Sequence, residues 1–229
     1  MLKPMSQLSG LIFDLDGTLV DSAPDLRQAL NAMLEQHDRR PLALGEVKTM
    51  VGDGMMPLID RAFTVTGGLP HGFNSYASFQ TFIAHYRSLK ADPAQIYAEA
   101  RTMLEKYHAA GVKLGICTNK QEAATVHLLE ELDLARYFSF VSGGDTFPTH
   151  KPHPDHVKGV MKGLGVATAN CAMVGDSPND VLGAHGAGIS CIAVTHGYGS
   201  AYGQLGADKL IAGFKELPEA LGALGFDLG

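Results

Sequence analysis

Residues 11–17, Leu-Ile-Phe-Asp-Leu-Asp-Gly, combine a short apolar run with two carboxylates and a glycine. An apolar run of this length, bounded by a turn residue, is typical of a buried strand, and the pattern predicts a strand over 11–15. Asp14 and Asp16 are two residues apart, so their side chains project to the same side if the strand continues through them. The first predicted strand therefore leads into a tight loop that carries two acidic groups.

The segment that follows has the spacing of a helix. Its apolar residues recur on one face, at Leu26, Ala29, Leu30, Met33 and Leu34. Asp38 and the adjacent Arg-Arg-Pro interrupt this pattern, and further helical segments are predicted around 47–66 and 75–89, with no clear strand between them. We therefore predict that residues 21–91 form a small all-helical cap domain, inserted after the first strand.

The remainder of the chain alternates between helix and strand. Helices are predicted over 99–110, 122–132, 155–164, 179–187 and 217–224, and strands over 112–117, 138–142, 171–174, 190–194 and 210–211. Such alternation is typical of a doubly wound, mainly parallel sheet of the Rossmann-like kind. The predicted fold is thus α/β, with a catalytic core formed by residues 1–20 and 92–229.

The composition argues against several classes of function. The chain has 229 residues and a formal net charge of -6, so it lacks an overall basic charge that would attract nucleic acid or an anionic membrane. No stretch approaches the ~20 apolar residues of a membrane-spanning helix. The three cysteines (Cys117, Cys171 and Cys191) lie far apart, without the spacing of a disulfide framework or a zinc site. We expect a cytoplasmic monomer or homodimer whose partner is a small metabolite.

Polar side chains follow the predicted strands where each one ends. Asp14 and Asp16 follow the first strand, Thr118 and Asn119 the second, Lys151 lies in the loop beyond the third, and Asp176 and Asp180 follow the fourth. Ligands of doubly wound sheets bind outside the carboxyl ends of the strands. Neighbouring carboxylates repel each other unless a cation joins them, and Mg²⁺ prefers oxygen ligands. A magnesium site that includes Asp176 is therefore predicted at this edge, with Lys151 able to neutralise another face of a phosphate.

These residue types suit phosphoryl transfer. A carboxylate can attack phosphorus and form an aspartyl-phosphate, and Asp14 fits that role. Asp16 could protonate the departing alkoxide and then activate water, provided that its surroundings favour the protonated form. The alternative is that Asp14, Asp16 and Asp21 only mark a turn and the start of a helix. That alternative leaves the matching polar groups after three other strands unexplained.

Residues 13–22, Phe-Asp-Leu-Asp-Gly-Thr-Leu-Val-Asp-Ser, resemble the first motif of haloacid dehalogenase-type phosphatases. The later motifs of that family are resembled, in the same order, by Thr118-Asn119, Lys151-Pro152 and the run from Gly175 to Asp180. The resemblance implies that Asp14 is the nucleophile and Asp16 the acid and base.

The same resemblance implies a set of ligands. Mg²⁺ would be held by the Asp14 carboxylate, the Asp16 main-chain carbonyl and Asp176, with Asp180 supporting this set. The phosphoryl oxygens would be held by Thr118, Asn119 and Lys151, and the lysine would also reduce repulsion between nucleophile and substrate.

Within this family the helical insert resembles a cap that closes over the site and selects the leaving group. Residues 51–54, Val-Gly-Asp-Gly, followed by Arg61-Ala62 and by 195–199, Thr-His-Gly-Tyr-Gly, resemble phosphoglycolate phosphatases. Gly52, Asp53 and Gly54 would bind substrate closely, and Arg61 would meet a substrate carboxylate if it faces the cleft. The alternatives are that Asp53 caps a helix and that Arg61 is solvated. The sequence departs from the family pattern at Ala98-Glu99, where Pro-Gly is usual, and at His196.

Other activities remain open from the sequence. Hydrolysis of another small ester, such as a sugar phosphate, pyrophosphate or nucleotide, would use the same residues. A phosphosugar mutase would return the phosphoryl group to a sugar instead of water. A receiver-like module would keep the acidic pocket without turnover, but the second carboxylate, Asp16, and a large cap argue against it.

Overall fold

The computed structural model describes residues 6–69, 72–199, 203 and 205–227. Its main sheet has six parallel strands in the order β4-β3-β2-β5-β6-β7. They are β2 (Gly10–Phe13), β3 (Lys113–Cys117), β4 (Phe138–Ser142), β5 (Cys171–Gly175), β6 (Ser190–Val194) and β7 (Lys209–Ile211). The chain builds β3 and β4 on one side of β2 and the other strands on the other side. The carboxyl end of β2 is therefore the switch point at which doubly wound sheets bind ligands.

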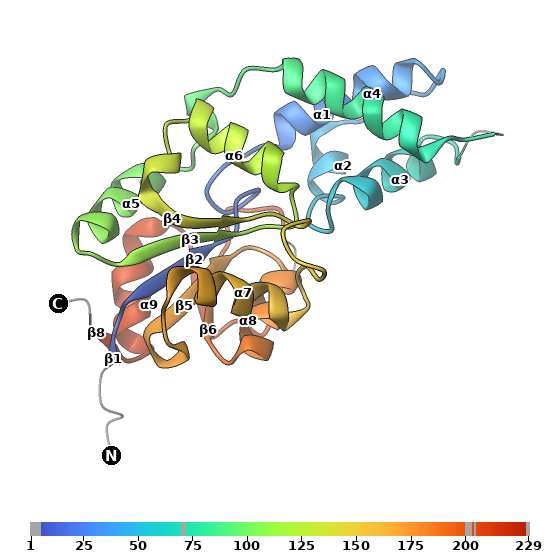
Figure 1. Ribbon diagram of the computed structural model, residues 1–229. Coiled ribbons are helices and arrows are strands. Elements are labelled where there is room, and N and C mark those ends of the chain that lie inside the picture. Colours follow the sequence, from blue (N-terminus) through green and yellow to red (C-terminus); the bar gives the residue numbers. More distant parts are fainter. Residues whose placement is uncertain (1–5, 70–71, 200–202, 204, 228–229) are drawn as a thin grey trace.

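Helices cover both faces of this sheet (Figure 1). One face packs against α5 (Ala100–Ala109), α6 (Glu122–Glu131) and α9 (Leu217–Ala223), and the other against α7 (Pro154–Leu164) and α8 (Pro178–Ala187). Successive residues of each strand alternate between the two sides: Leu11 and Phe13 belong to the first apolar cluster and Ile12 to the second. The predicted doubly wound α/β fold is confirmed.

Between β2 and β3 the chain forms a separate group of helices. They are α1 (Ala23–Glu35), α2 (Leu44–Lys48), α3 (Met55–Val65) and α4 (Ser75–Ser88). Their buried faces form an apolar cluster of their own, which includes Leu30, Phe63 and Phe82. Figure 1 shows this group at one end of the sheet, while β1 (Ser6–Gln7) and β8 (Phe226–Asp227) lie at the opposite end. The helical insert is present, and the proposed domain boundaries at 20/21 and 91/92 remain predictions.

Two local features differ from the sequence-based expectation. The segment 47–66 is not one continuous helical piece, because the chain breaks between α2 and α3 at a loop that contains Gly52 and Gly54, with φ of 131° and 93°. Such positive φ values suit glycine and interrupt a helix. In addition, β1 (Ser6–Gln7) pairs in parallel with β8 (Phe226–Asp227). Two-residue strands are too short to show a hydrophobic period, so this pair could not be predicted.

The first predicted strand is shorter than expected. It ends at Phe13, because the Leu15 carbonyl accepts hydrogen bonds from the main-chain N–H groups of Thr18, Leu19 and Val20, and this folds the chain into a turn. Asp14 and Asp16 therefore do not share one face of a continuing strand, and their carboxylates have different surroundings.

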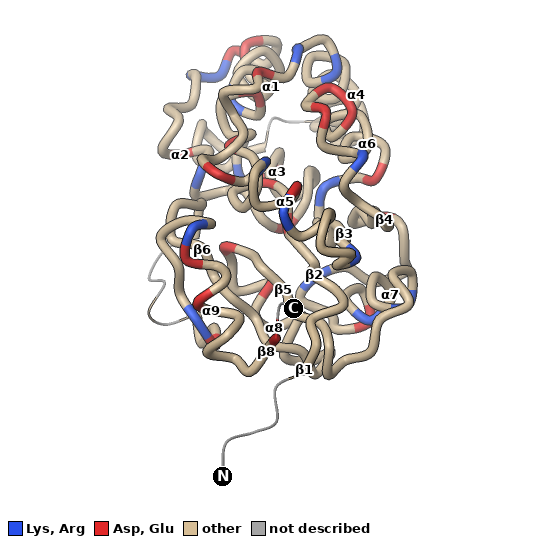
Figure 2. The backbone as a smooth tube through the Cα atoms, turned by 90° about the vertical axis from the view of Figure 1, so that its left-hand side faces the viewer, with Lys and Arg blue, Asp and Glu red and all other residues tan. Residues whose placement is uncertain are grey.

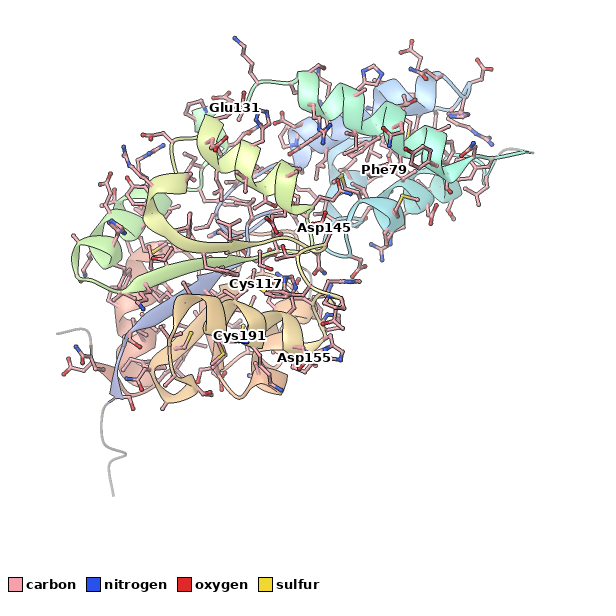
Figure 3. The ribbon with its side chains drawn as sticks, viewed as in Figure 1. Phe79, Cys117, Glu131, Asp145, Asp155 and Cys191 are labelled. Carbon is pink, nitrogen blue, oxygen red and sulfur yellow. The ribbon has the colours of Figure 1, made fainter. Side chains whose placement is uncertain are left out.

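The cysteines belong to the packed interior. Figure 3 shows Cys117 and Cys191 among the side chains of the sheet region, and neither has any exposed surface. Burial raises the pKa of the Cys117 thiol to about 12, so the thiol stays protonated at neutral pH. These residues act as small apolar side chains.

Two further features of the structure are the distribution of its charged residues and the length of its helices. Figure 2 shows basic and acidic positions interspersed over both parts of the molecule. Within the part of the chain that the structure describes, no helix is long and apolar enough to cross a membrane.

Candidate active site

Asp14 lies immediately after β2, at the switch point of the sheet. Its main-chain N–H donates to the Val174 carbonyl of β5 at 2.9 Å, which fixes the backbone where the side chain leaves the strand. The carboxylate is buried, and its Oδ1 forms an ion pair with Lys151 Nζ at 3.0 Å. The next turn passes close to Asp176: a Cβ on Gly17, whose φ is +86°, would lie 2.5 Å from Asp176 Oδ2. A glycine is therefore required at this position.

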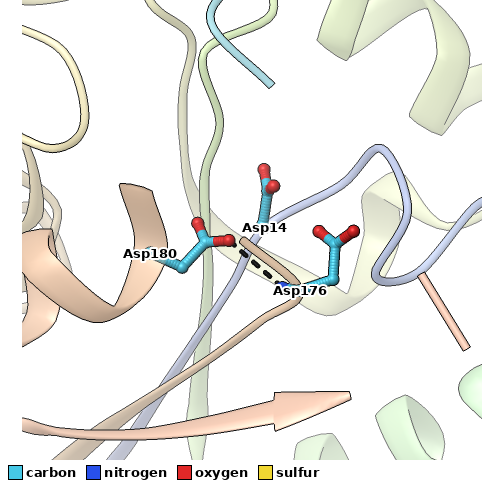
Figure 4. A group of neighbouring side chains, drawn as sticks. All are labelled: Asp14, Asp176 and Asp180. Atoms are coloured by element: carbon cyan, nitrogen blue, oxygen red, sulfur yellow. Dashed lines mark hydrogen bonds between the residues drawn. The ribbon is translucent and has the colours of Figure 1, made fainter. Parts of the chain in front are cut away.

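Three aspartates converge at the carboxyl ends of β2 and β5. One carboxylate oxygen from each of Asp14, Asp176 and Asp180 lies within 4.8 Å of the other two. Figure 4 shows the three side chains grouped together. Burial raises the pKa of Asp176 to about 8, and the charges of Asp180 and Asp14 act in the same direction. Burial also raises the pKa of Asp14 to about 6, although Lys151 opposes this shift. An all-oxygen group whose negative charge is this unfavourable has the chemistry of a site for a hard divalent cation.

Asp180 has protein donors at both of its oxygens, as Asp176 has, but one of the donors to Asp180 is the Lys151 ammonium. Its Oδ1 accepts from Lys151 Nζ at 2.5 Å, and its Oδ2 accepts from Ser177 Oγ at 2.7 Å and from the Asp176 main-chain N–H at 3.1 Å. This arrangement suits a supporting position, in which Asp180 orients its neighbours, better than direct ligation of a cation.

Lys151 lies between two carboxylates. Burial disfavours its charge, but Asp14 and Asp180 outweigh this effect and raise the pKa of Lys151. The ammonium is therefore a permanent positive charge next to Asp14. The Lys151 main-chain N–H donates to His156 Nδ1 at 3.2 Å, which helps to fix the loop that carries the lysine.

The Asp176 carboxylate is positioned by segments that are distant in sequence. Its Oδ2 accepts from the main-chain N–H groups of Tyr198 at 2.6 Å and Gly199 at 3.3 Å, and its Oδ1 accepts from Thr18 Oγ1 at 3.3 Å. No role was assigned to Tyr198 from the sequence. Its position after the end of β6, where other strands also carry site residues, could have drawn attention to it.

Asp16 is held apart from the three-aspartate cluster. Both of its oxygens lie 3.2 Å from Lys120 Nζ, and Oδ1 accepts from Ser22 Oγ at 2.5 Å. Lys120 is buried, and its Nζ lies 4.7 Å from the centre of the Tyr86 ring in α4. No role was assigned to Lys120 from the sequence, although a cation directly after the strand-end pair Thr118-Asn119 was a usable signal.

Thr118 and Asn119 also lie close to Asp14, and with it they line a small cavity. Thr118 is buried, and its Oγ1 accepts from the Lys120 main-chain N–H at 3.3 Å. Asn119 Nδ2 donates to the Lys151 carbonyl at 2.9 Å and to the Gly52 carbonyl of the helical insert at 2.9 Å. The structure therefore brings Thr118, Asn119 and Lys151 together around Asp14, and their individual roles remain predictions.

The loop 49–54 of the helical insert reaches this site. Gly52 and Gly54 line the cavity that contains Asp14, and Asn179 Nδ2 donates to Asp53 Oδ1 at 2.7 Å. Arg61 is engaged within the insert, because it donates to the Met50 carbonyl at 2.7 Å and pairs with Asp53. Gly52 and Gly54 thus lie beside Asp14 in the cavity. A role of Gly52, Asp53, Gly54 and Arg61 in substrate binding remains a prediction.

A second cavity, of about 210 Å³, opens next to the first. The insert contributes Lys48, Thr49, Val51 and Gly52 to its wall, and the core contributes Asp14, Asp16, Asp176, Ser177, Pro178, Tyr198 and Gly199. This volume is below the roughly 300–1,000 Å³ of sites for drug-sized ligands. The arrangement therefore suits a small ligand held between the two parts of the molecule, with one end at the aspartates.

Comparisons with known proteins identify the family of the chain. The chain is 38% identical over 222 residues to a phosphoglycolate phosphatase of Caulobacter vibrioides, covering 96% of this chain and 94% of the relative. It is 40% identical to a phosphoglycolate phosphatase of Rhodospirillum rubrum, covering 93% and 90%. A crystal structure of a predicted phosphoglycolate phosphatase from Haemophilus somnus superposes with a TM-score of 0.87 at 28% identity, covering 94% of this chain and 98% of that one. Residues 11–194 match the model of the haloacid dehalogenase-like hydrolases, and the chain belongs to this family.

Proposed function

We propose that this protein is a magnesium-dependent phosphatase of small phosphomonoesters that uses Asp14 as its nucleophile. The observation that carries the proposal is the position of Asp14, which lies within the three-aspartate cluster and 3.0 Å from Lys151. A phosphoryl group there would meet a carboxylate nucleophile, a permanent ammonium and a cation-binding group of oxygens.

The reaction has two half-reactions. In the first, an Asp14 oxygen attacks phosphorus, the ester P–O bond breaks, and the departing alkoxide takes a proton from Asp16. In the second, Asp16 removes a proton from water, the water oxygen attacks the same phosphorus, and the bond to Asp14 breaks to release inorganic phosphate. Thr118, Asn119 and Lys151 hold the phosphoryl oxygens in both. Asp16 must exchange its contact with Lys120 for one with the leaving oxygen.

The cation completes the charge balance of the site. The Asp14 carboxylate, the Asp16 main-chain carbonyl and Asp176 would hold Mg²⁺. Asp180 would support this set indirectly, because it accepts hydrogen bonds from Ser177 and Lys151. When bound, the ion supplies positive charge that offsets the carboxylates and the phosphoryl oxygens. Helices α1–α4 act as the cap, which excludes water while the phosphoryl group is transferred.

The proposed substrate is 2-phosphoglycolate. Two relatives that match most of the chain carry that name, and the cavity of about 210 Å³ suits a molecule of this small size. The test is phosphate release from 2-phosphoglycolate, pyrophosphate, sugar phosphates and nucleotides, with and without Mg²⁺, with kcat/KM compared across substrates.

Each outcome of this panel has a clear meaning. A large magnesium-dependent preference for 2-phosphoglycolate supports the full proposal. Magnesium-dependent release that is spread over other esters keeps the phosphatase and rejects this substrate. The absence of release from every ester rejects hydrolysis, and conversion of one sugar phosphate into another would then identify a mutase.

A further inference from the structure

Lys48 has a cationic side chain that lines the cavity, and the reaction proposed above gives this side chain no role. It is the last residue of α2, and it lines the same cavity as Asp14 and Asp176. Among the described residues that line this cavity, it is the one that carries a positive charge. Lys151 and Lys120 are committed to the carboxylates of the core, and Arg61 is engaged by Asp53 and the Met50 carbonyl.

The Lys48 ammonium is held at the cavity by a small hydrogen-bonded group. It donates to Asp21 Oδ2 at 2.9 Å, and its Nζ lies 5.4 Å from the centre of the Tyr198 ring. The Tyr198 hydroxyl donates to Asp21 Oδ1 at 2.8 Å and accepts from the Ala23 main-chain N–H at 2.9 Å. An ammonium has three donors, and Asp21 takes one of them in this structure. Lys48 can therefore keep this contact and also bind a second anion.

We infer that Lys48 binds the second anionic group of the substrate, a carboxylate on the leaving group, and so selects esters that carry one. This inference rests on the proposed function and adds to it the residue that recognises the leaving group. Asp14 of the core and Lys48 of the helical insert line the same cavity, so a substrate with its phosphoryl group at Asp14 would have its far end within reach of Lys48. An ester of a neutral alcohol makes no such contact.

The simpler interpretation of the same geometry is an ion pair that fastens α2 to the segment leading from the core into the helical insert, because Lys48 ends α2 and Asp21 lies just before α1. The side chains of the pair are 33% and 28% exposed, and a pair of that kind contributes little stability by itself. A substitution of Asp21 distinguishes the two interpretations. Loss of Asp21 removes the ion pair but leaves the charge that would bind a carboxylate.

The experiment compares kcat/KM for 2-phosphoglycolate and for ethyl phosphate, which lacks the carboxylate, in the wild type and in Lys48→Met, Lys48→Arg and Asp21→Asn. We expect Lys48→Met to lower kcat/KM for 2-phosphoglycolate by about 10- to 100-fold, because one charge-assisted hydrogen bond is lost. The kcat/KM for ethyl phosphate should stay within about threefold of the wild-type value. Lys48→Arg retains most of the preference, and so does Asp21→Asn.

The contradictory results are distinct. If Lys48→Met slows both esters equally, or if Asp21→Asn abolishes the preference as fully as Lys48→Met does, Lys48 acts only as a cap contact and the inference is wrong. If Lys48→Met keeps the wild-type preference, the carboxylate is bound elsewhere, and the proposed function survives without Lys48. If the wild type itself hydrolyses both esters equally well, the proposed substrate and the inference both fail.

Discussion

Asp14 combines two properties that a nucleophilic carboxylate needs. It is almost fully buried, and it stands beside a lysine whose charge Asp180 helps to hold in place. The lysine keeps the carboxylate available, while the neighbouring aspartates make its charge costly until a cation joins them. The lysine and the neighbouring aspartates thus have opposite effects on the charge of Asp14. Because each effect comes from a single side chain, single substitutions should separate the two.

Asp14→Asn replaces the attacking oxygen with an amide of nearly the same shape. We expect kcat to fall by at least about a thousandfold, because the covalent step is lost while the rest of the pocket remains. The measurement is phosphate release from 2-phosphoglycolate, with far-ultraviolet circular dichroism as the check on folding. A folded variant with kcat within tenfold of the wild type would exclude Asp14 as the nucleophile.

The buried, neutral side chain of His156 should make the stability of the protein depend on pH. It is fully buried, and the N–H of Lys151 donates to its Nδ1, so the ring is neutral, with its proton on Nε2 facing Ser142 Oγ at 2.8 Å. Burial, together with the charges of Lys151 and His150, lowers the pKa of His156 to about 4. Between pH 6.5 and 4 the unfolded chain therefore binds a proton that the native protein does not, and stability falls as the pH falls through this window.

His156→Gln should remove this contribution. Between pH 7 and pH 5 the wild type should lose on the order of 1–2 kcal/mol more unfolding free energy than the variant does. Urea denaturation at the two pH values measures the difference, and the half-exposed His127, changed to Gln, serves as the control. Equal pH dependence in wild type and His156→Gln would show that His156 is not held neutral.

Much of the candidate site was predictable residue by residue, because a parallel sheet places its strand ends at one edge. Asp14, Thr118 and Asp176 were found in this way. Lys120 and Tyr198 were not assigned, because their contacts with Asp16 and Asp176 join segments far apart in sequence, and no spacing rule reports such pairs.

At the scale of elements, the loop between α2 and α3 joins the helical insert to the core. Asn119, after β3, and Asn179, in the first turn of α8, both donate to the Gly52 carbonyl, at 2.9 Å and 3.2 Å. Asn179 also donates to Asp53 Oδ1. One loop of the insert is therefore fastened to two strand ends of the core, next to Asp14.

Asn179→Ala should loosen this junction. We expect amide hydrogen exchange of residues 49–54 to become faster by roughly fivefold or more, since each hydrogen bond contributes about 1 kcal/mol. Exchange measured by mass spectrometry tests this, with Asn74→Ala as the control, because Asn74 caps the first turn of α4. Unchanged exchange in this loop would mean that Asn179 does not hold the insert.

Element boundaries were the part of the fold that the sequence predicted least well. The end of β2 at Phe13 depends on the hydrogen bonds of the Leu15 carbonyl, and the break in 47–66 depends on the conformation of two glycines. Glu99, at the start of α5, adopts a φ of 61° where the family pattern has glycine. A left-handed glutamate is not foreseeable from propensity, because it is costly and tertiary contacts must stabilise it.

At the scale of the whole molecule, the protein has separate apolar cores. The cluster of the helical insert, which also includes Ala124 of α6, is distinct from the two clusters on the faces of the sheet. The alternation of helix and strand predicted the sheet and its two helical layers. The position of the insert over the strand ends was expected from the family resemblance alone, because it depends on contacts such as those of Asn119 and Asn179, which no residue pattern reports.

Phe63→Ala should show the independence of these cores. Phe63 is fully buried and packs edge-to-face against His37 and Phe73, so its truncation leaves a cavity that costs about 3–5 kcal/mol. We expect hydrogen exchange to accelerate in α1–α4, while β2, β3 and β5 keep their protection. Phe63→Leu serves as the milder control. Equal loss of protection in the sheet would show that the molecule unfolds as one unit.

The measurement that tests the central claim most directly is the location of a phosphoryl group on the protein during turnover. Wild type and Asp16→Asn are mixed with 2-phosphoglycolate and Mg²⁺, quenched in acid within milliseconds, digested, and examined by mass spectrometry. We predict phosphorylation of Asp14 in both proteins, with more accumulating in Asp16→Asn if water activation is slowed more than attack. Phosphate release from the wild type with Asp14 unmodified throughout, or a phosphoryl group on another residue, would contradict the mechanism.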